Sequence, residues 1–496
     1  MSETYFSKFR KGIIGIDQSI QTPFGVKKII YADWVASGRL YAPIEDIMRN
    51  HIAPYCANTH TETNLTGSLM TISYHESKKF IKHELNAHET EDILIFSGSG
   101  MTDSVNKLQR ILGLRIPEKA GIYLGLIERK IESERPIVFI THLEHHSNHT
   151  SWLETIADVE IINPDADGLV DLNHFAELLE QYKNRPLKIA SISACSNVTG
   201  IFTPYYEIAE MIHDAGGYCF VDFACSAPYV NINMHPENPK QFLDAVFISP
   251  HKFLGGPGTP GIMVINNRIC NNIVPDNSGG GTVKFTTPWK YHEYIDEIEE
   301  REDGGTPPFL QGIKAGLCFK LKKEMGVANI LQREEELVEL VLDRLGQIPN
   351  LHILAGDLKH RLGAISFYIE DLHFNLGVKL LNDLYGIQVR GGCSCAGTYG
   401  HYLLNINQEI STNIINKIKA GEQFSKPGWI RLSLHPTQTD EEINTILTAI
   451  EYISKNHVEL EENYYHDDHK NIFHHKNFSS DFETDFIHQL FEKEFQ

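Results

Sequence analysis

The sequence predicts an α/β protein in which a mainly parallel central sheet is flanked by helices and is accompanied by a smaller α+β domain. From about residue 91 to 260, short β-branched runs alternate with amphipathic segments, the pattern of a parallel sheet covered on both faces. At 496 residues the chain also exceeds what one hydrophobic core usually organises, so a second domain is expected.

The expected strands of the first part run into polar or glycine-rich loops. They are "DILIFSGSG" (92–100), "PIVFITHLEHHSN" (136–148), "KIASISACSNVTG" (188–200), "YCFVDFA" (218–224) and "AVFISPHK" (245–252). A helix is predicted over 102–112, and another over 203–217, which has proline near its start and glycines at its end. Ligands of open α/β sheets bind at the carboxyl ends of such strands.

The later part of the chain reads as long helices and isolated strands. Segment 331–347 predicts a long helix, and 437–456 predicts another that opens with a Thr439-x-x-Glu442 capping box. Strands are expected at 362–371 and 428–436. We therefore expect an N-terminal segment that joins the small domain, a large domain, the small domain and an acidic, histidine-rich extension, over 1–50, 51–310, 311–455 and 456–496.

The sequence of the C-terminal extension is compatible with two structures. Phe482, Phe486, Leu490 and Phe495 could line one face of a docked helix, or the segment could be a frayed tail.

Composition excludes several classes of function. The formal net charge of −21 argues against a nucleic-acid binder and against docking on an anionic membrane. The N-terminus lacks the apolar core of a signal peptide, and no run approaches the ~20 apolar residues of a membrane span. The eight cysteines show neither a disulfide rhythm nor paired CxxC motifs. Reduced thiols in the cytoplasm are therefore expected.

Several polar clusters follow the predicted strands. "SGSGMTDSVN" is typical of a phosphate cradle at a helix N-terminus, although a plain glycine turn has the same composition. "THLEHHSNH" holds four histidines but only one acid, Glu144, which favours one ring stacking on a flat ligand over a metal site. Asp222 follows an apolar strand, either as a turn residue or as the buried partner of a cationic heteroatom.

Lys252 stands at a strand end in "SPHKFLGG". In a tight turn its amine can be desolvated, and the neutral amine can form an imine with an aldehyde. An anion cradle, a stacking ring, a buried acid and an imine-forming lysine are the four groups that pyridoxal phosphate (PLP) requires. We therefore expect PLP as the cofactor, and no metal.

The ordered motifs resemble the class V aminotransferase family of fold-type I PLP enzymes, which includes cysteine desulfurases and selenocysteine lyases. The resemblance runs from about residue 30 to 453, through "YADWVASG", "GMT", "EHHSN", "SNVTG", "VDFA", "SPHK", "REDGGTPP", "VRGGCSCAG" and "RLSLH". It implies a cofactor site formed by Gly100, Met101, Thr102, His145, Asn197, Asp222, Cys225, Ser249, His251 and Lys252. In it, His145 stacks on the cofactor and Lys252 forms the imine.

The resemblance also implies how substrate and partner bind. Arg431, with Arg390 and Asn197, would hold the carboxylate of a small amino acid, and Cys395 stands at the sulfur-accepting position. Thr306 would reach the phosphate of a neighbouring subunit, which implies a homodimer.

The chain departs from the family pattern at several points, which indicates a divergent branch. Cys225 replaces a glutamine that usually bonds to the cofactor hydroxyl, and Thr61 stands where desulfurases often carry arginine. Met101 replaces a threonine of the phosphate turn, and 112–135 resembles an insertion.

The function predicted from the sequence is cysteine desulfurase-like removal of sulfur or selenium from a small amino acid. It would leave alanine and a persulfide on Cys395, which a sulfur-acceptor protein could take. One alternative is an aminotransferase, lyase or epimerase in which Cys395 has no catalytic role. A second is that Cys393 and Cys395 form a redox or metal-binding pair. A third is a scaffold that holds PLP and binds a partner through its C-terminal tail.

Overall fold

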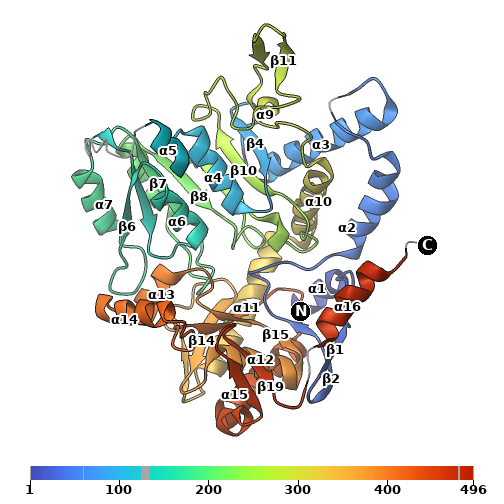
Figure 1. Cartoon of the computed structure of the whole chain (residues 1–496), viewed down its shortest axis with the longest axis vertical. Helices are drawn as coiled ribbons and strands as arrows, with labels where there is room; N and C mark the ends of the chain where they lie inside the picture. Colours follow the sequence, from blue (N-terminus) through green and yellow to red (C-terminus); the bar gives the residue numbers. More distant parts are fainter. Residues whose placement is uncertain (1, 60, 125–133, 479–480, 495–496) are drawn as a thin grey trace.

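The computed structural model describes residues 2–59, 61–124, 134–478 and 481–494. It contains a large α/β body and a smaller body that packs below it in Figure 1. Among the described helices, none combines the length and the apolar character that a bilayer crossing requires.

The large body is built on a seven-stranded sheet with the order β4-β10-β9-β8-β7-β5-β6. β10 runs antiparallel to β4 and β9 on its two sides, and the other strand pairs of this sheet are parallel, so the predicted mainly parallel sheet is confirmed. β6 and β10 are not among the strands expected from the sequence. The seven strands are β4 (Asp92–Ser97), β5 (Ile137–Thr141), β6 (Asp158–Ile162), β7 (Lys188–Ser193), β8 (Tyr218–Asp222), β9 (Ala245–Ile248) and β10 (Gly261–Asn266).

Both faces of this sheet are buried, as the continuous apolar runs of its strands require. In β4, Ile93 and Ile95 face one core cluster, and Leu94 and Phe96 face the other. The first face packs against α4 (Met101–Ile111) and α6 (His146–Leu153). The second packs against α3 (Leu65–Glu84), α7 (Leu172–Gln181), α8 (Tyr205–Asp214) and α10 (Phe309–Met325).

The smaller body has its own core around a four-stranded sheet with the order β13-β14-β17-β16. The strands are β13 (Leu351–Ile353), β14 (Ala364–Ile369), β16 (Arg390–Gly392) and β17 (Trp429–Ser433), and the helices are α11 (Val327–Leu345), α12 (Phe374–Tyr385) and α15 (Asp440–Glu461). The N-terminal segment contributes β3 (Ile30–Tyr31), which pairs in parallel with β15 (Ile387–Gln388), and α1 (Ser2–Arg10), which packs on α11.

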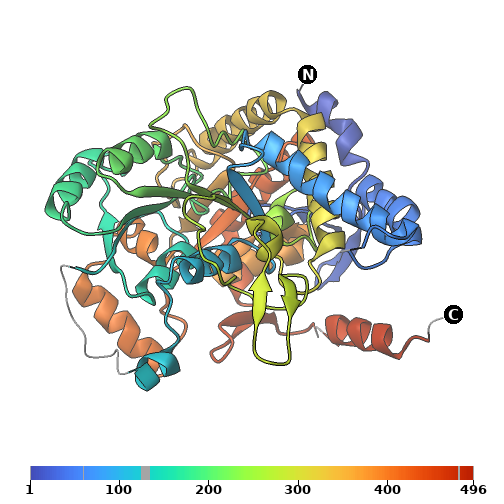
Figure 2. The ribbon, with the colours of Figure 1, turned by 90° about the horizontal axis from the view of Figure 1, so that it is seen from above.

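Further helices and strands connect the two bodies or lie at their surfaces. They are β1 (Ser19–Thr22), β2 (Gly25–Lys28), α2 (Ala42–Ile47), α5 (Glu118–Leu124), α9 (Ile298–Arg301), α13 (Gly397–Leu403) and α14 (Gln408–Lys419). A hairpin of β11 (Val283–Thr286) and β12 (His292–Tyr294) projects from the large body (Figures 1 and 2). Of the suggested insertion 112–135, residues 125–133 lie outside the described residues.

The C-terminal extension forms more structure than the sequence indicated. A hairpin of β18 (Tyr464–Asp467) and β19 (Ile472–His475) buries Tyr464 and Phe473 in the small-body core. Helix α16 (Asp481–Glu492) follows and points away from the body in Figure 2. Its Phe482, Phe486 and Leu490 are exposed, so the helix forms without docking this face, and Phe495 lies outside the described residues.

Candidate active site

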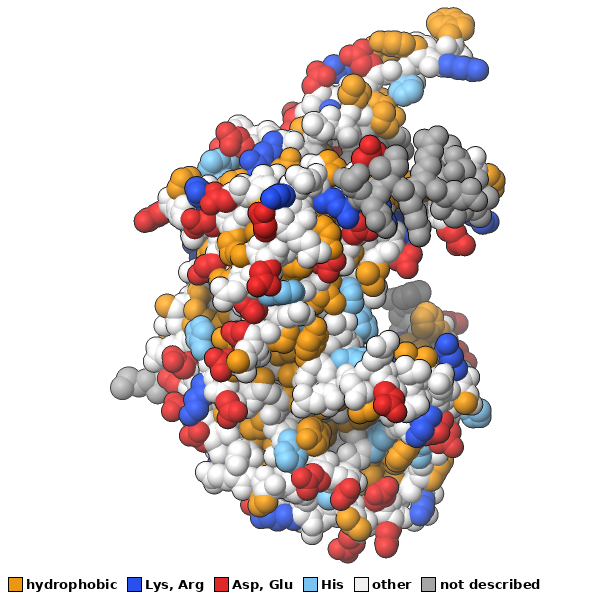
Figure 3. All heavy atoms as spheres, turned by 90° about the vertical axis from the view of Figure 1, so that its left-hand side faces the viewer, with side chains coloured by type: hydrophobic (Ala, Val, Ile, Leu, Met, Phe, Trp, Pro, Cys, Tyr) orange, Lys and Arg blue, Asp and Glu red, His pale blue; other side chains and the backbone are white. Residues whose placement is uncertain are grey.

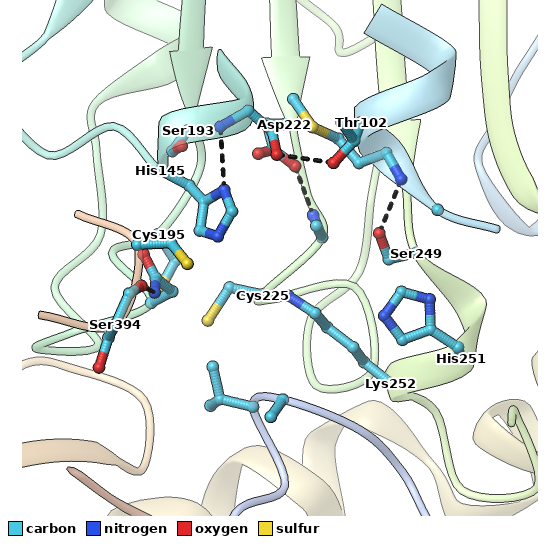
Figure 4. A pocket seen from close by; sticks show the side chains of 18 of the residues that line it. Thr102, His145, Ser193, Cys195, Asp222, Cys225, Ser249, His251, Lys252 and Ser394 are labelled. Carbon is cyan, nitrogen blue, oxygen red and sulfur yellow. Dashed lines mark hydrogen bonds between the residues drawn. The ribbon is translucent and has the colours of Figure 1, made fainter. Parts of the chain in front are cut away.

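One cavity of about 240 Å³ lies where the carboxyl ends of the parallel strands meet the small body (Figure 4). Every candidate residue except Thr306 lines it: Gly100, Met101, Thr102, His145, Asn197, Asp222, Cys225, Ser249, His251, Lys252, Arg390, Cys395 and Arg431. Parallel strands end at one edge of a sheet, so loops far apart in the sequence converge there.

The first turn of α4 forms one end of this cavity. Gly100 precedes the helix, and the Met101 N–H donates to Ser249 Oγ at 2.9 Å. The Thr102 and Ser147 hydroxyls lie 2.6 Å apart, and the His251 ring bonds through Nδ1 to the Ser99 carbonyl at 2.9 Å. A Cβ on Gly100 would lie 2.9 Å from His251 Cε1, so glycine leaves the room that backbone approach to a phosphate needs.

Lys252 ends a short 3₁₀ turn, Pro250–Lys252, that directly follows β9. The turn is packed too tightly for larger residues, because a Cβ on Gly256 would lie 1.8 Å from the Pro250 carbonyl oxygen. Figure 4 shows the lysine side chain extending across the cavity toward Cys225. Desolvation lowers the pKa of Lys252, and the negative charges of Cys225 and Asp222 oppose that shift.

Asp222 is a buried acid at the end of β8, with 6% of its surface exposed. Its Oδ1 accepts a hydrogen bond from the Ala224 N–H at 2.8 Å. Burial raises the pKa of Asp222 to about 7, against the lowering effects of that hydrogen bond and of Lys252. A cationic ring nitrogen against this carboxyl would favour its ionised form.

His145 presents a neutral ring to the cavity from the start of α6. Its Nδ1 accepts a hydrogen bond from the Ser147 N–H at 3.1 Å, and burial followed by repulsion from Lys252 lowers its pKa to about 3. The neighbouring Glu144 is buried and bonds to Thr141, Ser193 and Asn148. The acid of the histidine cluster is therefore already engaged by hydrogen-bond donors.

The two arginines expected to hold a substrate carboxylate share one acid. Arg431 Nη2 lies 2.8 Å from Asp33 Oδ1, and Arg390 Nε lies 3.0 Å from Asp33 Oδ2. Arg431 also donates through Nη1 to the Asn197 carbonyl at 3.1 Å. Two buried atoms at this end, Arg431 Nε and Asn197 Oδ1, have no hydrogen-bond partner in the described part of the chain. They remain available to a bound acceptor and a bound donor.

Cys395 lies on a strained loop that closes the cavity from the small-body side. Ser394 and Cys395 have φ values of +52° and +56°, which residues other than glycine rarely adopt. The loop is fastened where it bends, because Asn197 Nδ2 donates to the Ser394 carbonyl at 2.8 Å and Trp429 Nε1 to Ser394 Oγ at 3.2 Å. Cys395 is exposed and carries a free thiol.

Comparisons with known proteins show which family has this sequence. The family model for aminotransferase class V matches residues 30–446. The chain belongs to this family. A probable cysteine desulfurase of Halalkalibacterium halodurans is 27% identical over 376 residues, which span 74% of this chain and 84% of the relative. A cysteine desulfurase of Haloferax volcanii is 25% identical over 382 residues, 74% of this chain and 80% of the relative.

Solved structures of the same kind share the fold. An apo cysteine desulfurase of Thermococcus onnurineus aligns with a TM-score of 0.72 at 24% identity and covers 90% of this chain and 98% of its own. A cysteine desulfurase of Escherichia coli aligns with a TM-score of 0.69 at 18% identity, over 92% of this chain and 98% of its own. The fold-type I architecture predicted from the motifs is confirmed.

Two features of the site in this class V aminotransferase family member are not indicated by its sequence motifs. Asp33 belongs to "YADWVASG", but nothing in that stretch indicated that its acid meets both arginines. Cys195 also lines the cavity, after β7, and the thiols of Cys195 and Cys225 both donate to the Ser196 carbonyl, at 3.6 and 3.8 Å. The neighbouring Cys195 thiol is the main cause that lowers the pKa of Cys225, the residue at the usual glutamine position.

Thr306 lies outside the cavity and is exposed, 3.3 Å from Asn58 Nδ2 through its hydroxyl. A separate cluster, His88, Asp92 and His235, has the composition of a metal site, but it lies at the far end of β4. The Asp92 carboxylate there already accepts from His235, the His88 N–H and Asn266.

Proposed function

We propose that this enzyme is a PLP-dependent cysteine desulfurase that converts L-cysteine to alanine and leaves a persulfide on Cys395. The single observation that carries the proposal is that the Lys252 amine, the Arg431 guanidinium and an exposed Cys395 thiol line one cavity. The curated relatives named above, which are cysteine desulfurases, support the same reaction.

The residues present fit PLP. The first turn of α4, with Thr102, Ser249 and His251, would hold its phosphate, and Lys252 would join its aldehyde carbon. Asp222 would face the ring nitrogen and His145 one face of the ring. Bound there, PLP supplies an electron sink that makes the substrate Cα proton acidic.

The protein's own groups would then carry out the reaction. Arg431 and Arg390 bind the substrate carboxylate, which orients its Cα toward Lys252. Once the substrate amine has displaced Lys252 from the aldehyde carbon, the freed lysine amine takes up the Cα proton. The Cys395 thiolate attacks the substrate sulfur. The carbon–sulfur bond breaks with its electron pair remaining on carbon, a sulfur–sulfur bond forms, and protonation of that carbon completes alanine.

A single-turnover assay with L-cysteine tests this function. We expect one alanine and one persulfide per subunit, with the persulfide mapped to Cys395 by mass spectrometry. Cys395→Ser should form alanine slowly or not at all, whereas Cys393→Ser should retain the reaction. Amino-group transfer to a keto acid that survives Cys395→Ser would instead establish an aminotransferase.

Borohydride reduction followed by peptide mapping tests the cofactor separately. A pyridoxyl label on Lys252 is the expected result, and a label elsewhere or none would overturn the proposed role of this lysine. Reduction of Lys252→Ala is the matched control.

We also propose a cytoplasmic homodimer that hands its sulfur to an acceptor protein. The exposed position of Thr306 leaves it available to a second subunit, and the eight cysteines are all free thiols, as a reducing compartment allows. Sedimentation analysis should give twice the chain mass. Thr306→Ala should weaken PLP retention if this side chain reaches the neighbouring phosphate.

A further inference from the structure

His146 contacts the Cys395 loop at two points. Its backbone N–H donates to the Cys395 carbonyl at 2.7 Å, and its ring Nε2 accepts a hydrogen bond from the Gly397 N–H at 2.9 Å. The two bonds lie on either side of Ala396, so one residue holds the backbone both at the thiol and just beyond it. His145, the preceding residue, faces the cavity.

The loop needs such restraint because its backbone conformation is unfavourable. Ser394 and Cys395 are consecutive residues with positive φ, and neither is glycine. Gly397 allows the approach of His146, since a Cβ there would lie 3.2 Å from the His146 Nε2. Without the contacts that hold it, the loop would relax toward commoner backbone conformations, and the thiol would leave its present position.

The ring contact requires neutral His146. An Nε2 that accepts a hydrogen bond carries no proton, so the ring proton resides on Nδ1. Burial, followed by repulsion from Lys426, lowers the pKa of His146 and keeps the ring neutral at pH 7. Titratable groups near it include Cys395, whose carbonyl accepts from the His146 N–H, His145, whose ring lies 6.3 Å away, and His149, whose ring bonds to Thr398 on α13.

Histidine side chains gather near the middle of the molecular face shown in Figure 3. Helix α6 carries His146 and His149, and helix α13 carries His401. Only His146 among these three bonds to the backbone on both sides of Ala396.

We propose that His146 is a positioning residue that holds the Cys395 loop in the conformation from which its thiol meets the substrate sulfur. The catalytic part of this inference rests on the proposed desulfurase function, whereas the restraint of the loop does not. Consecutive residues at the start of α6 would then serve two purposes: His145 faces the cofactor position and His146 holds the nucleophile.

The test compares His146→Ala with His146→Gln and the control His149→Ala in the PLP-loaded enzyme. Alanine removes the acceptor for the Gly397 N–H. The glutamine side-chain oxygen reaches about as far as a histidine Nε2 and should restore it. His149→Ala removes a contact between α6 and α13 but leaves both bonds of His146 intact.

Hydrogen exchange of the peptide that contains 393–397 gives the first readout. We expect exchange to rise roughly tenfold in His146→Ala and to stay near the wild-type rate in the other two variants. As the pH is lowered and the ring gains a proton, wild-type protection should fall, after correction for intrinsic exchange, whereas His146→Gln should show no such loss.

Persulfide formation gives the second readout. His146→Ala should lose roughly tenfold in the single-turnover rate, with the L-cysteine concentration dependence and the cofactor absorbance unchanged. Unchanged exchange in His146→Ala, or an equal defect in His146→Gln, would overturn the positioning role. Full alanine production by Cys395→Ser would overturn the desulfurase function instead, and the exchange result would still stand.

Discussion

Asp33 and Arg431, which are 398 residues apart in the chain, form an ion pair of 2.8 Å beside the cavity. Arg431 is almost fully buried, with 3% of its side chain exposed. The N-terminal segment thus supplies the counter-charge for an arginine of the small-body sheet. Because Arg390 bonds to the other oxygen of Asp33, this acid orients both candidate carboxylate-binding groups.

Replacing Asp33 with asparagine should weaken both stability and substrate binding. The variant leaves the buried Arg431 charge unpaired, which should cost about 3 kcal/mol in the free energy of unfolding. The two guanidinium groups would also lose their common orientation, so KM for L-cysteine should rise more than kcat falls. Chemical denaturation and steady-state kinetics measure the two effects, and an unchanged KM would contradict this role of Asp33.

Asp222 should make the stability of the PLP-free protein fall as pH rises. Its folded pKa, about 7, exceeds the unfolded value of 3.8, so the folded state binds more protons between these values. Stability is therefore highest below pH 3.8 for this group and decreases up to about pH 7, by roughly 4 kcal/mol in total.

Denaturation of Asp222→Asn across the same pH range provides the control, because the amide does not titrate. The pH-dependent loss should disappear in that variant. The pH-dependent loss of stability should also be smaller in the PLP-loaded wild type, where a cationic ring nitrogen next to the carboxylate would favour its ionised form. Equal pH dependence in the wild type and the asparagine variant would assign the effect to other groups.

Cys225 should raise the pKa of Lys252, because its charge favours the ammonium form. In Cys225→Ala, the pH midpoint for Lys252 modification by an amine reagent in the PLP-free protein should fall. Cys318→Ala, which removes another buried thiol outside the cavity, should leave the midpoint unchanged. A midpoint that stays at its wild-type value in Cys225→Ala would show that the thiol is uncharged.

The capping box of α15 should contribute to the stability of the small body. Glu442 N–H donates to Thr439 Oγ1 at 3.1 Å, and the Thr439 N–H donates to Glu442 Oε2 at 3.3 Å. Thr439→Ala should cost about 1 kcal/mol in the free energy of unfolding. Thr448→Ala, at an exposed position of the same helix, is the control and should change stability by less than half as much.

Most of the site could be predicted from the sequence because its residues follow strands. His145, Asp222 and Lys252 come shortly after apolar runs, and parallel strands deliver such positions to one edge. Strand direction is harder to infer, since the apolar pattern of β10 is the same whether it runs parallel or antiparallel. The β18–β19 hairpin was missed because polar and histidine residues interrupt its apolar positions.

The sequence by itself determined the sheet class, the order of the motifs and the residues that line one end of the sheet, because strand periodicity and loop position are local properties. Tertiary structure alone decided that Asp33 meets Arg431, that Cys195 and Cys225 share the Ser196 carbonyl and that His146 holds the Cys395 loop. The distance between these residues along the chain does not predict how close they lie in the folded protein. Asp33 meets Arg431 because the N-terminal segment packs on the small-body sheet, Cys195 lies near Cys225 because β7 and β8 are neighbouring strands, and His146 reaches the Cys395 loop because the two bodies pack together.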